Sequence, residues 1–130
     1  MTDLIEVKTA DLSGEALGWA VGIAEGLELH LEPPHYGNGW LVFSIYRGEV
    51  TERCKRYNPW EAWALGGPLV DKHRGGCQWN RQGASDACYY AGPGNSMYWH
   101  YGPTALVAFC RGLVHSKLGD SVQVPKELVP

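Results

Sequence analysis

The sequence predicts an α+β protein, in which an antiparallel β-sheet carries an N-terminal and a C-terminal helix packed on one face. Helical periodicity is found near both ends, over residues 13–25 and 103–118. Between about residues 27 and 101, apolar and polar residues alternate in short runs that turn residues separate, which is typical of antiparallel strands. Each helix has one apolar stripe, so each needs a sheet face to cover. The order is therefore helix, sheet, helix.

The composition is that of a single globular domain covering residues 1–130. Hydrophobic residues make up 45% and charged residues 19%, and the net charge of −3 gives no general attraction to nucleic acid. No apolar run reaches the ~20 residues of a membrane span. The first residues, MTDLIEVKTADL, contain acids where a signal peptide has basic and apolar segments. We therefore expect a cytoplasmic protein.

The first helix has clear signals at both ends. Ser13 suits the N-cap, and Leu12 before it can pack onto Leu17 as a hydrophobic staple. Gly26 is expected to end the helix. The buried stripe then consists of residues at helical spacing: Leu17, Ala20, Val21 and Ala24.

The middle of the chain contains the strands. Residues 27–31 alternate as a half-buried strand does, whereas residues 40–46 are almost continuously apolar and predict a central strand. Residues 72–101 predict a meander around the turn sequence GPGN, residues 92–95. Cys77, Trp79 and Arg81 alternate with polar neighbours, Tyr89 precedes the turn, and Met97, Trp99 and Tyr101 alternate after it. Each strand is expected to place one apolar face on the core.

The second helix is expected to begin with Pro103, whose missing N–H costs nothing in the first turn, and to end at Gly119. Residues 120–130 are extended and interrupted by proline, and their end is expected to be loosely held. The stripe that faces the sheet contains Leu106, Phe109, Cys110 and Leu113.

No catalytic or metal-binding motif is found, so we expect neither an enzyme nor a bound metal or cofactor. His73 and Cys77 are four residues apart, but two ligands do not make a metal site. The cysteines form no C-x-x-C pair and are interpreted as reduced structural residues: Cys54, Cys77, Cys88 and Cys110.

Residues 56–70, RYNPWEAWALGGPLV, are unusual because two tryptophans lie in a segment rich in proline and glycine. Pro59 keeps Asn58 out of the helical region, and Gly66–Pro68 is expected to end a single helical turn. We expect a rigid loop in which Trp63 packs into the core and Trp60 is exposed for recognition.

This loop is the predicted binding site for a small anionic, nucleotide-like ligand. Its aromatic rings would stack on a base, and the cations around it would bind phosphates. The recognition residues are Tyr57, Asn58, Trp60 and Trp63, with Lys55, Arg56, His73 and Arg74 at the rim. If the loop only covers the sheet, the site is expected among the strands between Tyr89 and Tyr101 instead.

Two other functions stay open. Exposed tryptophan, tyrosine and arginine also suit a protein-binding inhibitor or adaptor. The helix–sheet–helix order is shared with double-stranded-RNA-binding domains, but the acidic balance and the lack of a basic helix face argue against nucleic acid. A homodimer is expected, because several aromatic residues exceed what one small core can bury: Trp40, Tyr46, Tyr90 and Tyr98.

Three blocks in order resemble the NinX-like family of tailed bacteriophages and prophages: KTADLSGEALGWAVGIAEGLEL, YNPWEAWALGGPLV and YGPTALVAFCRGLVHSKLGDSVQVPKEL. They cover roughly half of the chain. Leu65 departs from the polar residue that the family commonly has there. The resemblance implies a phage origin and no particular chemistry. We therefore expect a phage accessory protein in the cytoplasm of a bacterial host. It would bind a nucleotide used by host defence or, as an adaptor or inhibitor, a host or phage protein. The loop positions that match are Tyr57, Pro59, Trp63, Gly66, Gly67 and Pro68.

Overall fold

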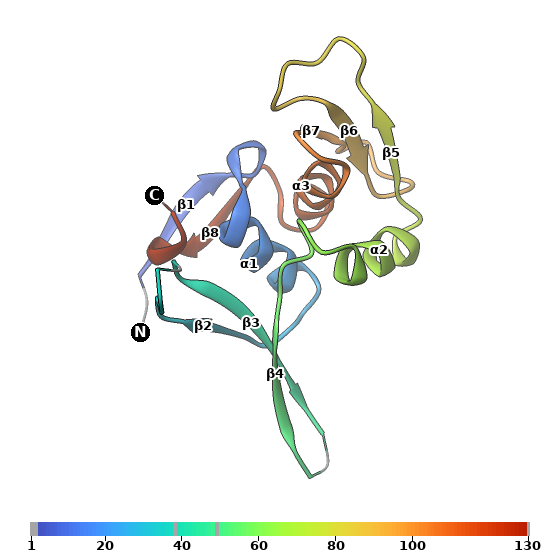
Figure 1. Ribbon diagram of the computed structural model, residues 1–130. Coiled ribbons are helices and arrows are strands. Elements are labelled where there is room, and N and C mark those ends of the chain that lie inside the picture. The colour runs from blue at the N-terminus through green and yellow to red at the C-terminus, as the bar shows by residue number, and fades with distance from the viewer. Residues whose placement is uncertain (1–2, 38, 49, 130) are drawn as a thin grey trace.

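The computed structural model describes residues 3–37, 39–48 and 50–129. Within these residues every pair of neighbouring strands is antiparallel, and helices lie near both ends, so the α+β class is confirmed (Figure 1). The strands do not form one sheet, however. They form three small sheets, in the orders β1-β8, β2-β3-β4 and β5-β6-β7.

The α-helices are α1 (Gly14–Ala24), α2 (Trp63–Lys72) and α3 (Ala105–Leu118). The strands in the first half are β1 (Leu4–Lys8), β2 (Leu29–Glu32), β3 (Leu41–Arg47) and β4 (Glu52–Arg56). Those in the second half are β5 (Gly76–Trp79), β6 (Tyr89–Gly92), β7 (His100–Gly102) and β8 (Ser121–Pro125). Short 3-10 turns follow β1 at Thr9–Asp11 and β8 at Lys126–Leu128.

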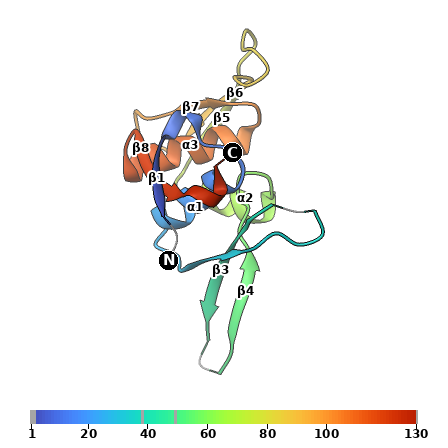
Figure 2. The same ribbon diagram turned by 90° about the vertical axis from the view of Figure 1, so that its left-hand side faces the viewer.

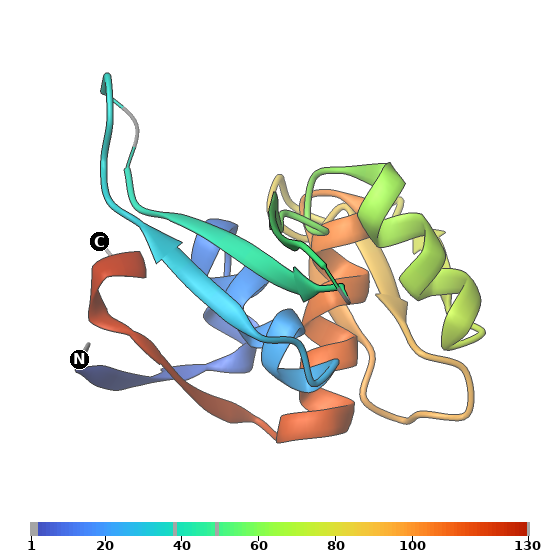
Figure 3. The same cartoon turned by 90° about the horizontal axis from the view of Figure 1, so that it is seen from below.

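Helix α3 lies at the centre of the molecule (Figure 3). It packs against the β5-β6-β7 sheet and against α1, and α1 in turn contacts β3 and β8. The two terminal helices thus share one core with all three sheets around them. Burial of these apolar side chains, at about 25 cal/mol per Å² removed from water, is the main stabilising contribution. The largest fully buried hydrophobic side chains are Phe109, Leu12, Leu17 and Leu113.

Two strand predictions are confirmed. Residues 41–47 form the central strand of β2-β3-β4, and β5, β6 and β7 form a meander. The apolar residues of the meander do not all face the core, however, since Trp79, Met97 and Tyr101 are exposed. The far end of the β3–β4 hairpin projects from the body as an arm (Figures 1 and 2). Its described side chains from Tyr46 to Lys55 are exposed, because no other element covers them.

Residues 121–125 are extended, as predicted, but the expectation of a loosely held end is wrong for residues 126–128. Strand β8 pairs with β1 from Leu4↔Pro125 to Lys8↔Ser121, and the Lys126 amide donates to the Asp3 carbonyl at 3.0 Å. Val122 and Val124 alternate inward and are buried in the core. The alternating burial of Val122 and Val124 stabilises this strand. Pro125 is its last residue, so the missing N–H of the proline removes no hydrogen bond from the interior of the ladder.

The helix ends follow their capping chemistry. Ser13 is the N-cap of α1, although its side chain makes no capping bond, and Leu12 and Leu17 are both buried. Helix α3 begins after Thr104, whose Oγ1 accepts a hydrogen bond from the Val107 amide at 3.1 Å. The prediction that Pro103 is the first helical residue is therefore wrong, because the N-cap is Thr104, one residue later, and its side chain bonds to the amide of Val107 in the first turn.

Helix α2 overturns the prediction that Gly66–Pro68 ends a single turn, since all three residues lie inside it. Pro68 has no N–H to donate to the carbonyl of Ala64, so α2 lacks one hydrogen bond at that point. Pro68 and Ala64 are both exposed, which allows water to bond to this carbonyl instead. Gly66 is buried where α2 meets α3, and a Cβ there would lie 2.6 Å from Leu106 Cδ2. The glycine serves close packing and not chain reversal.

Candidate functional site

The eight residues predicted to form one recognition loop do not form one site. They are distributed over the end of β4, the turn that follows, and the two ends of α2. Several of the polar ones are paired with carboxylates or carbonyl groups of the fold. The structure therefore corrects the predicted site residue by residue.

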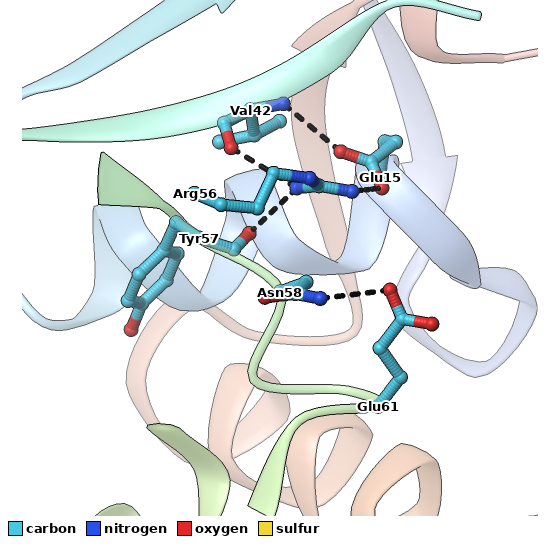
Figure 4. A network of polar contacts seen from close by, with 6 residues as sticks. All are labelled: Glu15, Val42, Arg56, Tyr57, Asn58 and Glu61. Atoms are coloured by element: carbon cyan, nitrogen blue, oxygen red, sulfur yellow. Dashed lines mark hydrogen bonds and ion pairs between the residues drawn. The ribbon is translucent and has the colours of Figure 1, made fainter. Parts of the chain in front are cut away.

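Arg56 ties two elements together (Figure 4). Its guanidinium forms an ion pair with Glu15 of α1 and donates to the Val42 carbonyl at 3.1 Å. The other carboxylate oxygen of Glu15 accepts from the Val42 amide at 2.9 Å. Both side chains are largely buried, so Arg56 anchors the β2-β3-β4 sheet on α1 and has little freedom to bind a phosphate.

Tyr57 was predicted to be a recognition residue, but it is only 4% exposed and belongs to the hydrophobic core. Burial, with the nearby charge of Glu25, raises the pKa of its hydroxyl well above the ordinary range. Pro59 is fully buried as well. The segment before α2 therefore packs inward, which corrects the prediction of a semi-exposed loop at these positions.

The predicted roles of the two tryptophans are reversed. Trp63 is 59% exposed, whereas Trp60 packs against the core and its indole Nε1 is buried beside Gly18 of α1. The physical reason is the start of α2: Trp63 is its first residue and faces water, while Trp60 lies in the preceding turn, which is pressed against α1. Trp63 is the exposed ring that can meet a partner.

Asn58 shapes the turn before α2. Its carbonyl accepts hydrogen bonds from the amides of Glu61 and Ala62, at 3.1 and 2.9 Å. Its side-chain amide donates to the Glu61 carboxylate at 2.8 Å (Figure 4). Asn58 therefore orients Glu61, and this local side-chain bond is typical of the residue that opens a turn.

The other rim residues separate. His73 bonds to Glu25 at 2.9 Å, and Lys72 joins the same carboxylate at 2.8 Å. Burial alone would raise the pKa of Glu25, but these two hydrogen bonds and the charges of their donors hold it below its ordinary value. Lys55 lies over the Tyr46 ring on the exposed arm, with Nζ 5.6 Å from the ring centroid, and Arg74 follows α2.

Two hollows remain as candidate sites. The first, the tryptophan groove, has a volume of about 520 Å³ and lies at the N-terminal end of α3. It brings together Trp60 and Trp63 of the predicted site with Tyr89 of β6. The remaining lining residues are Glu61, Pro103, Thr104, Ala105, Leu106 and Val107.

The second hollow, the 93–98 cavity, has a volume of about 740 Å³ and lies at the other end of α3. It includes His73 of the predicted site, and the backbone of Arg74 lies beneath its loop, since a Cβ on Gly94 would be 2.3 Å from the Arg74 carbonyl. The sequence marked this loop only as the turn GPGN. Its lining residues are His73, Pro93, Gly94, Asn95, Ser96, Met97, Tyr98, Ser116 and Lys117.

Hydrogen bonds fix the 93–98 loop at several points. The Gly94 amide donates to the His73 carbonyl at 3.0 Å, and the Trp99 indole donates to the Pro93 carbonyl at 2.8 Å. The hydroxyl of Ser96 bonds to that of Ser116 on α3 at 2.5 Å. Asn95 has a φ of +60°, a left-handed conformation that non-glycine residues seldom adopt. The cavity wall is thus preformed.

A family model described as bacteriophage P22 NinX matches residues 8–117. The chain belongs to the NinX family of bacteriophage proteins. The matched residues run from the end of β1 to the last turn of α3 and include both hollows. Among curated proteins none matches the chain.

This NinX family protein also has a histidine pair between β7 and α3. The ring nitrogens His100 Nε2 and His115 Nδ1 are 2.7 Å apart, and the Tyr98 ring stacks on His115 at 4.4 Å. Burial, followed by the charges of His115 and Arg111, lowers the pKa of His100. The pair links the meander to the central helix.

Within the residues described, no group of three histidine, cysteine or acidic side chains is placed to hold a metal ion. Cys110 is buried in the core, where burial raises the pKa of its thiol to about 12 and keeps it unreactive. None of the helices described in this NinX family protein is both long and apolar enough to cross a bilayer.

Proposed function

We propose that this phage protein is a non-enzymatic binding protein that sequesters a small anionic, nucleotide-like molecule in the 93–98 cavity. The observation that carries the proposal is the charge of the cavity wall. His73 and Lys117 are basic, and no acidic side chain is among the described residues that line it. The function expected from the sequence is kept, and its site moves from the loop before α2 to the meander.

The cations near this cavity are available for a ligand. Among the described residues, neither Lys117 nor Arg74 has a carboxylate within ion-pair distance. Arg56, Lys72 and His73, by contrast, are paired with Glu15 or Glu25. An anion in the cavity would thus meet one unpaired cation that lines it, Lys117.

The C-terminal end of α3 carries a partial negative charge that opposes the binding of an anion, so this charge must be compared with that of Lys117. The carbonyl end of a helix acts as about half a negative charge, and one of its carbonyls, that of His115, already accepts from the Gly119 amide. A full positive charge on Lys117, which lines the cavity, exceeds this effect. The charge at this end of α3 therefore favours an anion.

The other lining groups suit the rest of a nucleotide. Asn95 and Ser116 offer an amide and a hydroxyl, and the Tyr98 ring offers an aromatic face for a base. A volume of about 740 Å³ lies within the range of small-molecule sites. The hydroxyls of Ser96 and Ser116 bond to each other, and that of Ser96 also accepts from the Tyr98 amide. These bonds do not join either serine to a general base that could activate it as a nucleophile, which supports binding without catalysis.

Calorimetric titration with mononucleotides and with inorganic phosphate tests the proposal. A nucleotide is expected to bind more tightly than phosphate, and Lys117→Ala is expected to weaken binding about ten-fold, the loss of one charged hydrogen bond. Lys55→Ala is the matched control, because this cation lies on the exposed arm. Weakening by Lys55→Ala and not by Lys117→Ala would return the site to the segment before α2.

Native mass spectrometry of the protein incubated with lysate of phage-infected cells identifies the molecule. A retained small anion that Lys117→Ala releases supports sequestration of a host signal, such as one used in defence. Recovery of the protein with no added mass, together with no heat of binding for any nucleotide, contradicts the proposal.

A further inference from the structure

We propose that the tryptophan groove docks a basic side chain, arginine or lysine, of a partner protein. The groove and the 93–98 cavity share no lining residue, so the two proposals stand on separate observations. A protein partner would make this phage protein an adaptor or inhibitor as well as a binder of a small molecule.

The groove presents aromatic rings held in place by the fold. Trp60 is fixed from behind, since a Cβ on Gly18 of α1 would lie 3.1 Å from its Nε1. Trp63 is exposed and borders the same groove. The faces of such rings carry partial negative charge and attract cations, most strongly those of tryptophan. Rings that need no ordering on binding lose little entropy when a partner arrives.

The charge of the groove selects a cation. Among its described lining residues only Glu61 is charged, and the hydrogen bond from Asn58 at 2.8 Å orients its carboxylate. The N-terminal end of α3 acts as about half a positive charge at the same place. Thr104 Oγ1 already accepts a hydrogen bond from the Val107 amide, which reduces this partial positive charge. The full negative charge of Glu61 therefore exceeds the positive charge of the helix end. A guanidinium or ammonium group complements both the rings and the acid.

The surface around the groove is larger than a free amine would cover. Trp79, which is 63% exposed, packs edge-on against Tyr89, with ring centroids 5.3 Å apart. Exposed aromatic surface therefore continues beyond the groove from Tyr89 to Trp79 at the end of β5. Exposed aromatic surface beside a pocket is typical of protein interfaces, in which tryptophan and tyrosine supply most of the binding energy. This continuity favours a side chain of a protein over a small molecule.

Chemical shifts of the tryptophan indoles, measured by NMR, test the docking. The probes are blocked pentapeptides with a central arginine, glutamate or leucine between tyrosine and glycine residues, and arginine amide alone. The arginine peptide is expected to shift the Trp63 indole with a Kd on the order of 1 mM, since one exposed cation–π contact with an ion pair is weak. The glutamate and leucine peptides are expected to bind at least about ten-fold more weakly.

Variants separate docking from a structural role. Glu61→Gln is expected to weaken the arginine peptide about five-fold, and Trp63→Ala to abolish the remaining indole shifts while the thermal midpoint stays unchanged. Tyr36→Ala is the control, because this fully exposed ring lies in the loop after β2. It is expected to leave binding unchanged.

Three outcomes overturn the proposal. Equal shifts with the arginine, glutamate and leucine peptides would show a groove without charge preference. Arginine amide binding as tightly as the peptide would indicate a small amine instead of a protein. Indole shifts that depend on protein concentration alone would show that a second copy of the chain covers the groove.

Discussion

Glu15 of α1 and Arg56 of β4 form an ion pair in which the Glu15 side chain is 17% and the Arg56 side chain 29% exposed. Glu15 also accepts the Val42 amide of β3 at 2.9 Å. One carboxylate thus holds two neighbouring strands on the helix. This pair accounts for the position of the exposed arm relative to the core.

The first prediction concerns this pair. Glu15→Ala leaves the Arg56 charge and the Val42 amide without their partner, and is expected to lower the free energy of unfolding by about 2–3 kcal/mol. Urea unfolding followed by circular dichroism measures the change. Arg47→Ala, which breaks fully exposed ion pairs with Glu28 and Glu52, is the control and is expected to leave the midpoint unchanged. Equal losses in both variants would contradict a structural role special to Glu15.

The second prediction compares the two tryptophans. Trp60→Ala removes a ring that packs on the core, and is expected to cost about 2–4 kcal/mol of stability. Trp63→Ala removes an exposed ring and is expected to change stability by less than about 0.5 kcal/mol. Chemical denaturation of both variants decides between this order and the opposite one, which the sequence alone favoured.

The third prediction uses two adjacent glycines of α2. A Cβ at Gly66 would lie 2.5 Å from the Pro59 carbonyl oxygen, so Gly66→Ala is expected to destabilise the protein by about 2–3 kcal/mol. Beyond its chain neighbours, a Cβ at Gly67 would meet only Trp63, at 3.8 Å. Alanine favours a helix over glycine by about 1 kcal/mol, but Pro68 follows directly and disfavours the helical region for a residue with a Cβ, which offsets this gain. Gly67→Ala is therefore expected to change the free energy of unfolding by less than about 1 kcal/mol. A loss as large as that of Gly66→Ala would show that close packing does not distinguish the two positions.

The fourth prediction follows from the lowered pKa of His100. Below the ordinary histidine value of 6.5, the unfolded chain takes up a proton that the folded protein resists. The contribution of His100 to the free energy of unfolding is therefore fully present above about pH 6.5 and is lost as the pH falls through the pKa of His100 in the folded protein. Urea midpoints measured from pH 8 to pH 5 follow this loss.

The charged groups around His100 define the control for this pH dependence. His115 and Arg111 oppose a proton on His100, and Asp11 and Asp86 face Arg111. His100→Gln is expected to reduce the slope of the midpoint against pH between 6.5 and 5, whatever its effect at pH 8. An unchanged slope would assign the dependence to other groups.

The fifth prediction is that the protein is a homodimer. Tyr46 and Tyr98 are exposed, at 41% and 45%, and several other apolar side chains lie at the surface. Sedimentation velocity is expected to give the mass of two chains at micromolar concentration. A single species of 14.3 kDa at high micromolar concentration would reject the dimer.

The sequence predicted elements whose signals are local. Helix α1 between Ser13 and Gly26, the central strand at residues 41–47 and the meander of β5-β6-β7 all follow from periodicity and turn residues. Apolar stripes and caps act within a few residues, so they can be interpreted without knowing the fold.

The loop before α2 could not be predicted in the same way. Whether Trp60 or Trp63 is buried depends on the contact between that turn and Gly18, 42 residues earlier for Trp60. Gly66 and Gly67 look alike in sequence, but only Gly66 lies where α2 meets Leu106. The pairing of Arg56 with Glu15 is likewise set by tertiary structure, and it removes a cation that the sequence offered to a ligand. Long-range packing decides these positions.

The central place of α3 has a consequence for the order in which the chain can fold. The helix that contributes Phe109 and Leu113 to the core leaves the ribosome after α1, α2 and the strands from β1 to β7. The side chain of Thr9 bonds to the carbonyl of Gly119 at 2.7 Å, just beyond this helix. Until α3 is synthesised, the apolar face of α1 has no partner helix. Folding of the core must therefore wait for α3, and contacts so distant in sequence close slowly. Nascent chains truncated before residue 105 are expected to stay unfolded and prone to aggregation.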